Sequence, residues 1–408
     1  MLDRKSQIDK ILATPPEKIS IINLVDEIIS HAFETRASDI HLDPEEDRLI
    51  VRFRIDGVLH RLFIISKELQ PEIISRIKVM AGLRTDEHQS AQDGRFRSAV
   101  KDARFDIRVS IVPTYYEENL VLRLLAEQGQ EFILKEIGFS ERDLKILERA
   151  IKKPYGMILA TGPTGSGKTT TLYTILKILN TEQISIITIE DPIEYSLDGV
   201  NQIQVNAQTG LTFANGLRSI LRQDPNIIMV GEIRDIETAA IAVNAALTGH
   251  LLLSTLHTND AATTLPRLLD MKVEPFLIAS TVNIAIGQRL VRKLCQNCRK
   301  KHKLTISEIQ NLSSSVSADI LDALKNKSVF NGVGCDKCNN SGFIGRIGIH
   351  EVLEVTPAIQ EAIIKHFSAS QIKEIAVNEG MTTMLEDGFK KVVGGITTIE
   401  EVLRVMHE

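Results

Sequence analysis

Residues Gly162-Pro163-Thr164-Gly165-Ser166-Gly167-Lys168-Thr169 decide the fold that we expect for this chain. They satisfy the pattern G-x-x-x-x-G-K-[ST], in which glycines let backbone N–H groups surround phosphate oxygens and the lysine reaches the terminal phosphates. The apolar run Met157-Ile158-Leu159-Ala160 precedes this loop, and the spacing of residues 170–179 predicts a helix after it. That order aims a helix N-terminus at an anion. We therefore predict that Gly162 to Thr170 bind a nucleotide, with the Thr169 hydroxyl on Mg²⁺.

The bulk composition bounds the class of protein. A chain of 408 residues is too long for one ordinary core, so two or three domains are expected. The formal net charge of −5 and the absence of tryptophan disfavour a nucleic-acid binder. No apolar stretch approaches the roughly twenty residues that span a bilayer, and no signal peptide is recognisable at the N-terminus. We expect a cytoplasmic protein without direct membrane insertion.

The N-terminal third is predicted to be a tail or linker over residues 1–20 and an α+β domain over residues 21–126. Apolar residues at helical spacing predict a helix from Ile21 to about Arg36. The period then changes to two, which predicts short antiparallel strands joined by an Asp56-Gly57 turn. A second helix and a further hairpin are expected later in the domain. The predicted strands and helix cover residues 38–42, 49–55, 58–62, 72–82, 96–100 and 104–110.

Arginines recur on these strand-like segments. Any one of them could simply be solvated or paired with a nearby acid, but together they indicate a basic face. In a nucleotide enzyme, a separate arginine-bearing domain suggests an arginine finger supplied beside the phosphate loop. The arginines concerned are Arg52, Arg54, Arg95, Arg97, Arg104, Arg108 and Arg123.

After a polar linker predicted over residues 127–138, apolar strands alternate with helical segments over residues 139–408, which predicts an α/β domain with a mostly parallel sheet. Three of these strands end in polar side chains: residues 184–189 lead to Glu190-Asp191-Pro192-Ile193-Glu194, residues 227–230 to Gly231-Glu232, and residues 251–256 to His257. Ligands bind at this edge in such sheets. His250 and His257 flank the last strand; either alone could be a structural histidine, or His257 could sense a phosphate.

Together these motifs resemble the type II secretion and type IV pilus assembly ATPase family, hexameric motors that drive pilins or pseudopilins from the inner membrane. The resemblance covers the chain from about Ile21. It implies a RecA-like ATPase domain preceded by a smaller, PAS-like α+β domain. It rests on Ala37-Ser38-Asp39-Ile40-His41, Gln92-Asp93-Gly94-Arg95, the phosphate loop, Ile189 to Glu194, Gly231-Glu232-Ile233-Arg234-Asp235, and Thr248-Gly249-His250 through Leu256-His257-Thr258-Asn259.

Several site residues follow from the resemblance alone. It implies that Glu194 is the general base and that Glu232 acts on Mg²⁺ or the attacking water. Arg95 and Arg108 match arginines that the family presents to the nucleotide from its N-terminal domain. The remaining matches are a basic pair near the phosphates or the subunit seam, Arg218 and Arg222, and a histidine box, His250 and His257.

One departure from the family lies before the Val-x-Arg strand, where the family usually has Gly-Glu and this chain has Glu117-Glu118. The local turn and the role of Arg123 are left open by this difference. The chain is also shorter than most assembly members, which carry an additional N-terminal domain, so the direct docking and second-messenger binding attributed to that domain are left open here.

Four cysteines fall into two C-x-x-C pairs, Cys295/Cys298 and Cys335/Cys338. Such pairs predict a closed, structural Zn²⁺ site within an insert over residues 290–345, although four free buried thiols are an alternative. A helix over residues 307–324 could fill the wide separation between the pairs. The insert resembles assembly ATPases, since retraction ATPases generally lack it. Small helices are expected over residues 356–408.

The leading hypothesis is a hexameric, Mg²⁺-dependent ATPase at the inner membrane face, partnered by the platform protein of a pilus or secretion system. A translocating nucleic-acid motor and a nucleotide-gated scaffold without turnover are the alternatives. The sequence leaves open whether the cargo is a pilus, a pseudopilus or a DNA-uptake fibre, as well as the hexamer symmetry and firing order.

Overall fold

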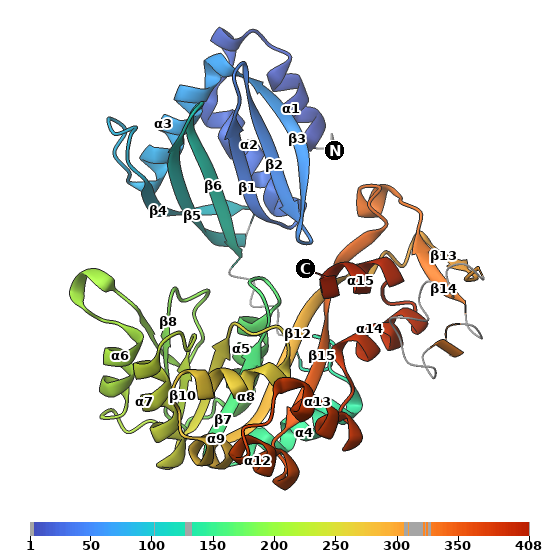
Figure 1. The fold of residues 1–408 in the computed structure, drawn as a ribbon. Coiled ribbons are helices and arrows are strands. Elements are labelled where there is room, and N and C mark those ends of the chain that lie inside the picture. The colour runs from blue at the N-terminus through green and yellow to red at the C-terminus, as the bar shows by residue number, and fades with distance from the viewer. Residues whose placement is uncertain are drawn as a thin grey trace. The chain divides into compact units, whose positions relative to one another are not determined.

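The computed structural model describes residues 4–101, 103–126, 133–305 and 328–407, with positions 309, 321, 322 and 324 between the last two ranges. The chain divides into two compact units, Met1–Gln130 and Glu131–Glu408. Figure 1 shows an antiparallel sheet with helices in the first unit and a larger sheet covered by helices in the second. We describe each unit by itself.

The first unit is built on a six-stranded antiparallel sheet in the order β3-β2-β1-β6-β5-β4. Helices α2 (Ile21–Glu34) and α3 (Gln70–Ala81) share one apolar core with the sheet. Ser20 caps α2 by accepting from the backbone N–H of Asn23, and Gly82 ends α3 at φ 67°. The predicted helices and hairpins are therefore confirmed. The strands are β1 (Ala37–Pro44), β2 (Arg48–Ile55), β3 (Val58–Ser66), β4 (Gln92–Val100), β5 (Ala103–Thr114) and β6 (Glu117–Ala126).

The N-terminal segment differs from the expected tail. Residues Arg4–Leu12 form helix α1, followed by a 3₁₀ turn at Pro16–Lys18. Ile8 is fully buried in the core of the unit, and Arg4 pairs with Glu27 at 2.7 Å. The polar composition of this segment hid its few apolar side chains, which are enough to dock one helix on α2.

The turn before β6 explains the departure at Glu117-Glu118. Glu117 has φ 81°, in the left-handed region that favours glycine. Its carboxylate accepts from Gln70 Nε2 at 2.8 Å. Glu118 is buried, and its Oε1 lies 2.8 Å from Nζ of the fully buried Lys78. Glu117 therefore holds a left-handed turn conformation that costs a non-glycine residue free energy.

The second unit contains a seven-stranded sheet in the order β15-β12-β7-β11-β10-β8-β9. All neighbouring pairs are parallel except β12 with β15. Along β7, Met157 and Leu159 enter one apolar cluster, and Ile158 and Ala160 enter the other. Both faces are therefore covered, and the predicted mostly parallel sheet is confirmed. The strands are β7 (Gly156–Thr161), β8 (Ile186–Glu190), β9 (Asn201–Gln204), β10 (Ile227–Val230), β11 (Leu251–Leu256), β12 (Val282–Leu294) and β15 (Phe343–Glu354).

The helices of this unit divide between the two faces of the sheet. Helices α4 (Glu141–Ile151) and α5 (Lys168–Leu179) contribute to one cluster. Those in the other cluster are α6 (Phe213–Ile220), α7 (Ile236–Leu247), α8 (Ala261–Asp270), α9 (Pro275–Thr281), α12 (Pro357–Ile364) and α13 (Ala369–Asn378).

The linker predicted over residues 127–138 extends too far, because its described residues, 133–138, pack in the second unit. Leu134 and Ile137 are buried in the core of the second unit, and the carbonyl of Ile137 accepts from Gly348 N–H at 2.9 Å. Residues 133–138 therefore belong to the second unit. Residues 127–132 lie outside the described part.

The cysteine insert contains a small antiparallel pair, β13 (Arg299–His302) and β14 (Val329–Gly332). The helix predicted over residues 307–324 falls almost entirely outside the described residues. Helices α14 (Met384–Val393) and α15 (Ile399–His407) pack against Val291 and Ile349, so the expected C-terminal helices are confirmed. Within the described ranges, no helix combines the length and apolar character needed to cross a bilayer.

Candidate nucleotide and metal sites

The predicted phosphate loop lies between the fully buried strand β7 and the N-terminus of α5. Gly162, Gly165 and Gly167 all have positive φ, at 143°, 78° and 91°. A Cβ on Gly162 would lie 2.4 Å from the carbonyl oxygen of Gln288, and one on Gly167 would lie 2.6 Å from its Nε2. Conformation therefore favours glycine at both positions, and at Gly162 the backbone of Gln288 also leaves no room for a side chain.

Lys168 is the first residue of α5 and is 9% exposed. Its Nζ donates to the carbonyls of Gly162 at 2.8 Å and Pro163 at 3.0 Å. Burial lowers the pKa of Lys168 to about 8; Glu232 opposes this change and Arg289 adds to it. Thr169 and Thr170 are half-buried in the first turn of the helix. The loop thus holds one ammonium group at a positive helix end, which suits a polyphosphate.

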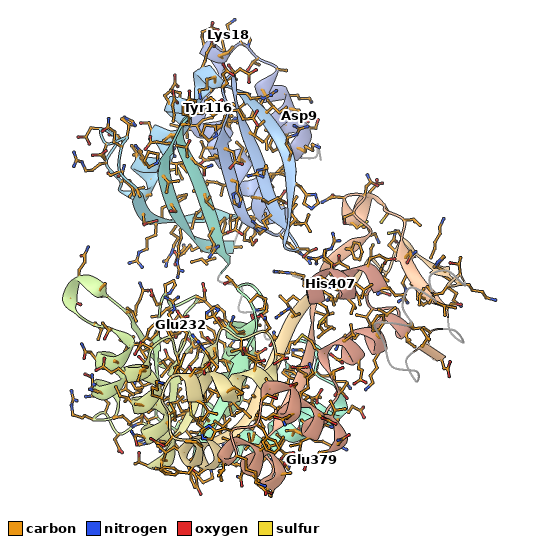
Figure 2. The ribbon with its side chains drawn as sticks, viewed as in Figure 1. Asp9, Lys18, Tyr116, Glu232, Glu379 and His407 are labelled. Atoms are coloured by element: carbon orange, nitrogen blue, oxygen red, sulfur yellow. The ribbon has the colours of Figure 1, made fainter. Side chains whose placement is uncertain are left out.

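Glu232 follows β10 in the second unit (Figure 2), and its charge acts on Lys168. It is 7% exposed, and its carboxylate lies 3.0 Å from Nε2 of His257 and 2.6 Å from Arg234. The structure therefore brings together three predicted residues, Lys168, Glu232 and His257, from three strand ends. A carboxylate here could bind a divalent cation or its water.

The acidic segment after β8 separates into two roles. Glu190 is buried and accepts from Tyr173, from Thr188 at 2.6 Å and from Gln202 at 3.1 Å. Burial, and then Glu190, raises the pKa of the Tyr173 hydroxyl far above its usual range, so that it remains a donor. Glu194 is half-buried; a hydrogen bond with its backbone lowers the pKa of Tyr173, and its charge raises that pKa by less. Glu190 is thus occupied by hydrogen bonds inside the unit, and the role of Glu194 as general base, which the resemblance implies, stays a prediction.

The two predicted histidines lie at opposite ends of β11. Thr161, the last residue before the loop, pairs with Leu256, whereas Gly156 at the start of β7 pairs with Leu251. His257 is therefore beside the loop, and His250 is about 20 Å away at the other edge of the sheet. His250 Nδ1 lies 2.9 Å from the carbonyl of Ala245 at the end of α7. The structure does not bring His250 to the phosphate loop of its own chain.

The arginines predicted to complete the site lie in the first unit. Arg95 on β4 is directly opposite Arg108 on β5, and Arg108 is opposite Arg123 on β6. Asp39 on β1 is opposite Arg123 and lies 2.9 Å from it. Because cross-strand partners share one face of a sheet, these residues form a row, which we call the arginine row. The expected basic face is present, and its role at the nucleotide stays a prediction.

Arg218 and Arg222 lie on and just after α6. Arg218 pairs with Glu237 of α7 at 2.5 Å, and Arg222 donates to the carbonyl of Arg218 at 2.8 Å. Both contacts hold the arginines on the surface of their own chain. Their predicted place at a subunit seam remains a prediction.

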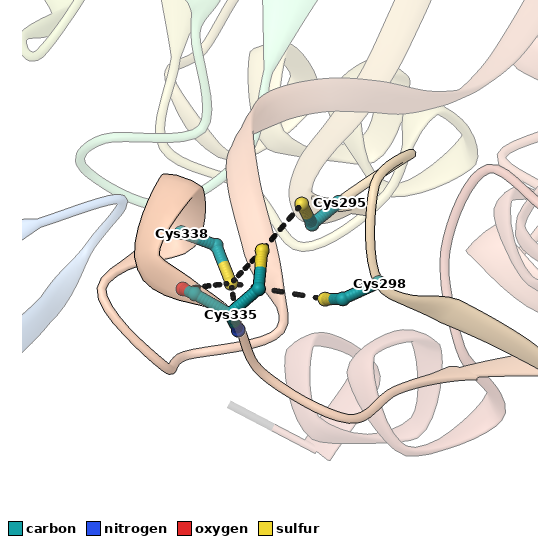
Figure 3. A group of neighbouring side chains, drawn as sticks. All are labelled: Cys295, Cys298, Cys335 and Cys338. Carbon is teal, nitrogen blue, oxygen red and sulfur yellow. Dashed lines mark hydrogen bonds between the residues drawn. The ribbon is translucent and has the colours of Figure 1, made fainter.

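The four cysteines meet at one point of the insert (Figure 3). Their sulfur atoms all lie within 4.8 Å of one another, with Cys295–Cys335 and Cys298–Cys338 both at 3.8 Å. The backbone N–H groups of Cys335 and Gly342 donate to Cys338 Sγ at 3.2 and 3.3 Å. Donors aimed at sulfur stabilise a thiolate, so this group could hold a metal ion.

Sequence reasoning missed Gln288, which contacts the phosphate loop from β12, and the buried pair Thr161 and Thr258. Thr161 Oγ1 lies 2.8 Å from the carbonyl of Thr258 and accepts from its N–H at 3.0 Å. This pair ties the start of the loop to the segment that carries His257. A polar residue directly after an apolar run was the available signal for Thr161, whereas the place of Gln288 depends on the pairing of β12 with β7.

Comparison with known proteins agrees with this geometry. The model of the family described as "Type II/IV secretion system protein" matches residues 16–404. The chain therefore belongs to the type II/IV secretion system protein family. It is 44% identical over 389 residues to the type II secretion system protein E of Aeromonas hydrophila, covering 95% of this chain and 76% of that protein. It is 43% identical to the type IV pilus assembly ATPase PilB of Myxococcus xanthus, covering 96% and 69%.

Solved structures of two other proteins share the fold. The Legionella pneumophila ATPase DotB matches with a TM-score of 0.70 and 21% identity, over 97% of this chain and 98% of that one. The pilus retraction motor PilT, solved with bound ADP, matches with a TM-score of 0.63 and 28% identity, over 93% and 96%. The predicted family and the predicted α/β fold of a phosphate-loop ATPase are thus confirmed. The PAS-like identity of the first unit stays a prediction.

Proposed function

We propose that this chain is a cytoplasmic, Mg²⁺-dependent ATPase that drives assembly of a type IV pilus or a type II secretion pseudopilus at the inner membrane. The observation that carries the proposal is the convergence of Lys168, Glu232 and His257 at one edge of the sheet, beside a loop that only glycines can build. Its relatives of 43–46% identity are named as secretion and pilus assembly proteins.

Each residue has a separate task in this reaction. Bound Mg²⁺ would neutralise charge on the phosphates, and the Thr169 hydroxyl and Glu232 are the oxygen donors that fit it. Lys168 binds the terminal phosphates, and Glu194 accepts the proton of the attacking water. His257 contacts Glu232 and senses the phosphate through it. Arg95 and Arg108 belong to another domain and neutralise the charge that develops on the phosphates. Assembly of the homo-hexamer is therefore needed for catalysis.

The cysteine cluster supports assembly over retraction and is best suited to Zn²⁺. Four sulfurs at about 2.3 Å from a zinc ion lie about 3.8 Å apart in a tetrahedron. The contacts between Cys295 and Cys335 and between Cys298 and Cys338, both 3.8 Å, match that edge. All four ligands come from the protein, so the ion is structural. The N-terminal unit corresponds to the PAS-like domain of the resemblance, and the partner is the inner-membrane platform protein of the system.

The test is ATP hydrolysis by the purified chain across a range of protein concentrations, with Glu194→Gln beside it. Turnover per chain should rise with assembly, and Glu194→Gln should keep nucleotide affinity while losing about 10²-fold or more in kcat. Glu182→Gln, an exposed carboxylate of the same unit, is the control and should leave turnover unchanged. Binding without turnover in the wild type would favour a nucleotide-gated scaffold, and DNA-stimulated turnover that is lost at high salt would favour a nucleic-acid motor.

A further inference from the structure

Gln288 lies where β12 leaves the sheet beside the phosphate loop. The β7–β12 ladder ends with Thr161 opposite Gly287, so Gln288 is the next residue and faces the loop. Its side chain is 2% exposed. Its Nε2 donates to the carbonyl of Ser166 at 2.8 Å, and its Oε1 accepts from the Thr171 hydroxyl at 2.7 Å. One amide therefore joins the last part of the loop to the first turn of α5.

The same residue also shapes the loop by contact. The backbone carbonyl of Gln288 occupies the space that a Cβ on Gly162 would need. Its side-chain Nε2 occupies the space that a Cβ on Gly167 would need. These two glycines lie on either side of residues 163–166, and Lys168 follows the second of them. Gln288 thus contacts the loop at its beginning and at its end, and its two hydrogen bonds span Lys168 and Thr169.

Only a primary amide satisfies both partners. The backbone carbonyl of Ser166 accepts a hydrogen bond, so its partner must donate. The hydroxyl of Thr171 donates, so its partner must accept. Both Ser166 and Thr171 are buried. A carboxylate would set acceptor against acceptor and add negative charge where an anion binds. A thioether of the same length would leave both groups without a partner, each at a cost in free energy.

We propose that Gln288 is a positioning residue, which holds the phosphate loop in its binding conformation before the nucleotide arrives. This inference rests on the proposed nucleotide function of the loop. Gln288 touches the loop rather than the nucleotide, so its loss weakens binding by allowing residues 162–169 to relax into other conformations.

Asn283 supplies a matched control on the same strand. It is 8% exposed, its Nδ2 donates to the carbonyl of Tyr155 at 3.0 Å, and its Oδ1 accepts from Lys153 at 3.0 Å. A Cβ on Gly156 would lie 2.4 Å from that Nδ2. Asn283 is thus a buried amide that braces a glycine turn against β12, at the opposite end of β7 from the nucleotide.

The experiment measures affinity for a fluorescent ADP analogue with Mg²⁺, and kcat and KM for ATP, in the full chain. Gln288→Met should raise Kd and KM about tenfold, the loss expected for two buried hydrogen bonds, with a smaller change in kcat. Gln288→Glu, which keeps the length and the Thr171 contact, should bind more weakly still. Thr171→Val removes one bond and should raise Kd by about threefold. Asn283→Leu should leave Kd within about twofold of the wild type.

Hydrogen exchange in the absence of nucleotide gives a readout that a general loss of stability would not reproduce. Gln288→Met should speed exchange over residues 162–171 while the strands β10 and β11 exchange as in the wild type. Unchanged Kd and loop exchange in Gln288→Met, or an equal loss of affinity in Asn283→Leu, would overturn the inference. A wild type that binds no nucleotide would instead overturn the proposed function.

Discussion

Replacing Lys78 with methionine tests the buried ion pair beneath the turn that precedes β6. Lys78 has no exposed surface; its Nζ lies 2.8 Å from Glu118 Oε1 and donates to the carbonyl of Glu87 at 2.6 Å. Glu118 is 5% exposed, and its other oxygen lies 2.9 Å from Nδ1 of His88. Methionine keeps the stem but leaves the carboxylate buried without its cation. Breaking such a pair costs about 3–5 kcal/mol, and we expect the lower end because His88 remains.

The assay is native-state hydrogen exchange followed by mass spectrometry, because it reads each unit separately in the intact chain. Amides of α3 and β6 that exchange only when the first unit opens should exchange roughly 100-fold faster in Lys78→Met. Amides of β7 and β11 in the second unit should be unaffected, and they serve as the internal reference.

Two further variants distinguish the effect of an unpaired buried carboxylate at Glu118 from a general loss of packing. Lys101→Met removes an ion pair of the same unit, to Glu34 at 3.4 Å, but that lysine is 75% exposed, so exchange should change by less than about fivefold. Lys78→Met combined with Glu118→Leu removes both charges and should regain most of the stability lost by the single variant. Exchange in Lys78→Met close to the wild type, or a double variant no better than the single one, would refute this reasoning.

Two other changes have expected outcomes. Burial lowers the pKa of Lys168 to about 8, and only the protonated amine attracts phosphate. ADP affinity should therefore fall as the pH rises through about 8, by roughly tenfold per pH unit above it. Calorimetric titrations of ADP from pH 7 to 9 measure this change. Lys168→Met should bind weakly with no such slope. Glu117→Gly relieves the strained φ of 81° but loses the contact to Gln70, whereas Glu117→Ala loses the contact and keeps the strain. Hydrogen exchange of β6 should show the glycine variant to be more stable than the alanine variant by about 1 kcal/mol, and the reverse order would contradict it.

The parts of the fold that the sequence predicted well are those where packing acts on neighbouring residues. Strands β7, β10 and β11 are buried on both faces, so each is a continuous apolar run that can be recognised without knowing its partners. Strand β9 lies at the edge of the sheet and has no fully buried residue, so nothing in its four residues marks it as a strand. Helix α1 was missed for the same reason, because Ile8 alone is fully buried there.

The candidate site was predictable to the extent that its residues belong to local motifs. The loop, Glu232 and His257 each follow an apolar strand directly, and strand ends meet at one edge of a parallel sheet. His250 belongs to the same motif as His257, but six residues of extended strand separate them, so proximity in sequence misleads here. Gln288 depends on the register between β7 and β12, strands about 120 residues apart, which no local pattern encodes.

The arginine row concentrates positive charge on one face of the first unit. Arg95, Arg108 and Arg123 are direct neighbours across three strands. Like charges in that arrangement destabilise a sheet, and Asp39 supplies a carboxylate at one end of the row. A polyanion placed against this face would be attracted by the three guanidinium groups. Arg95 and Arg108 therefore stay our predicted contacts to the phosphates of a nucleotide, and the row shows that their charges lie together on one face.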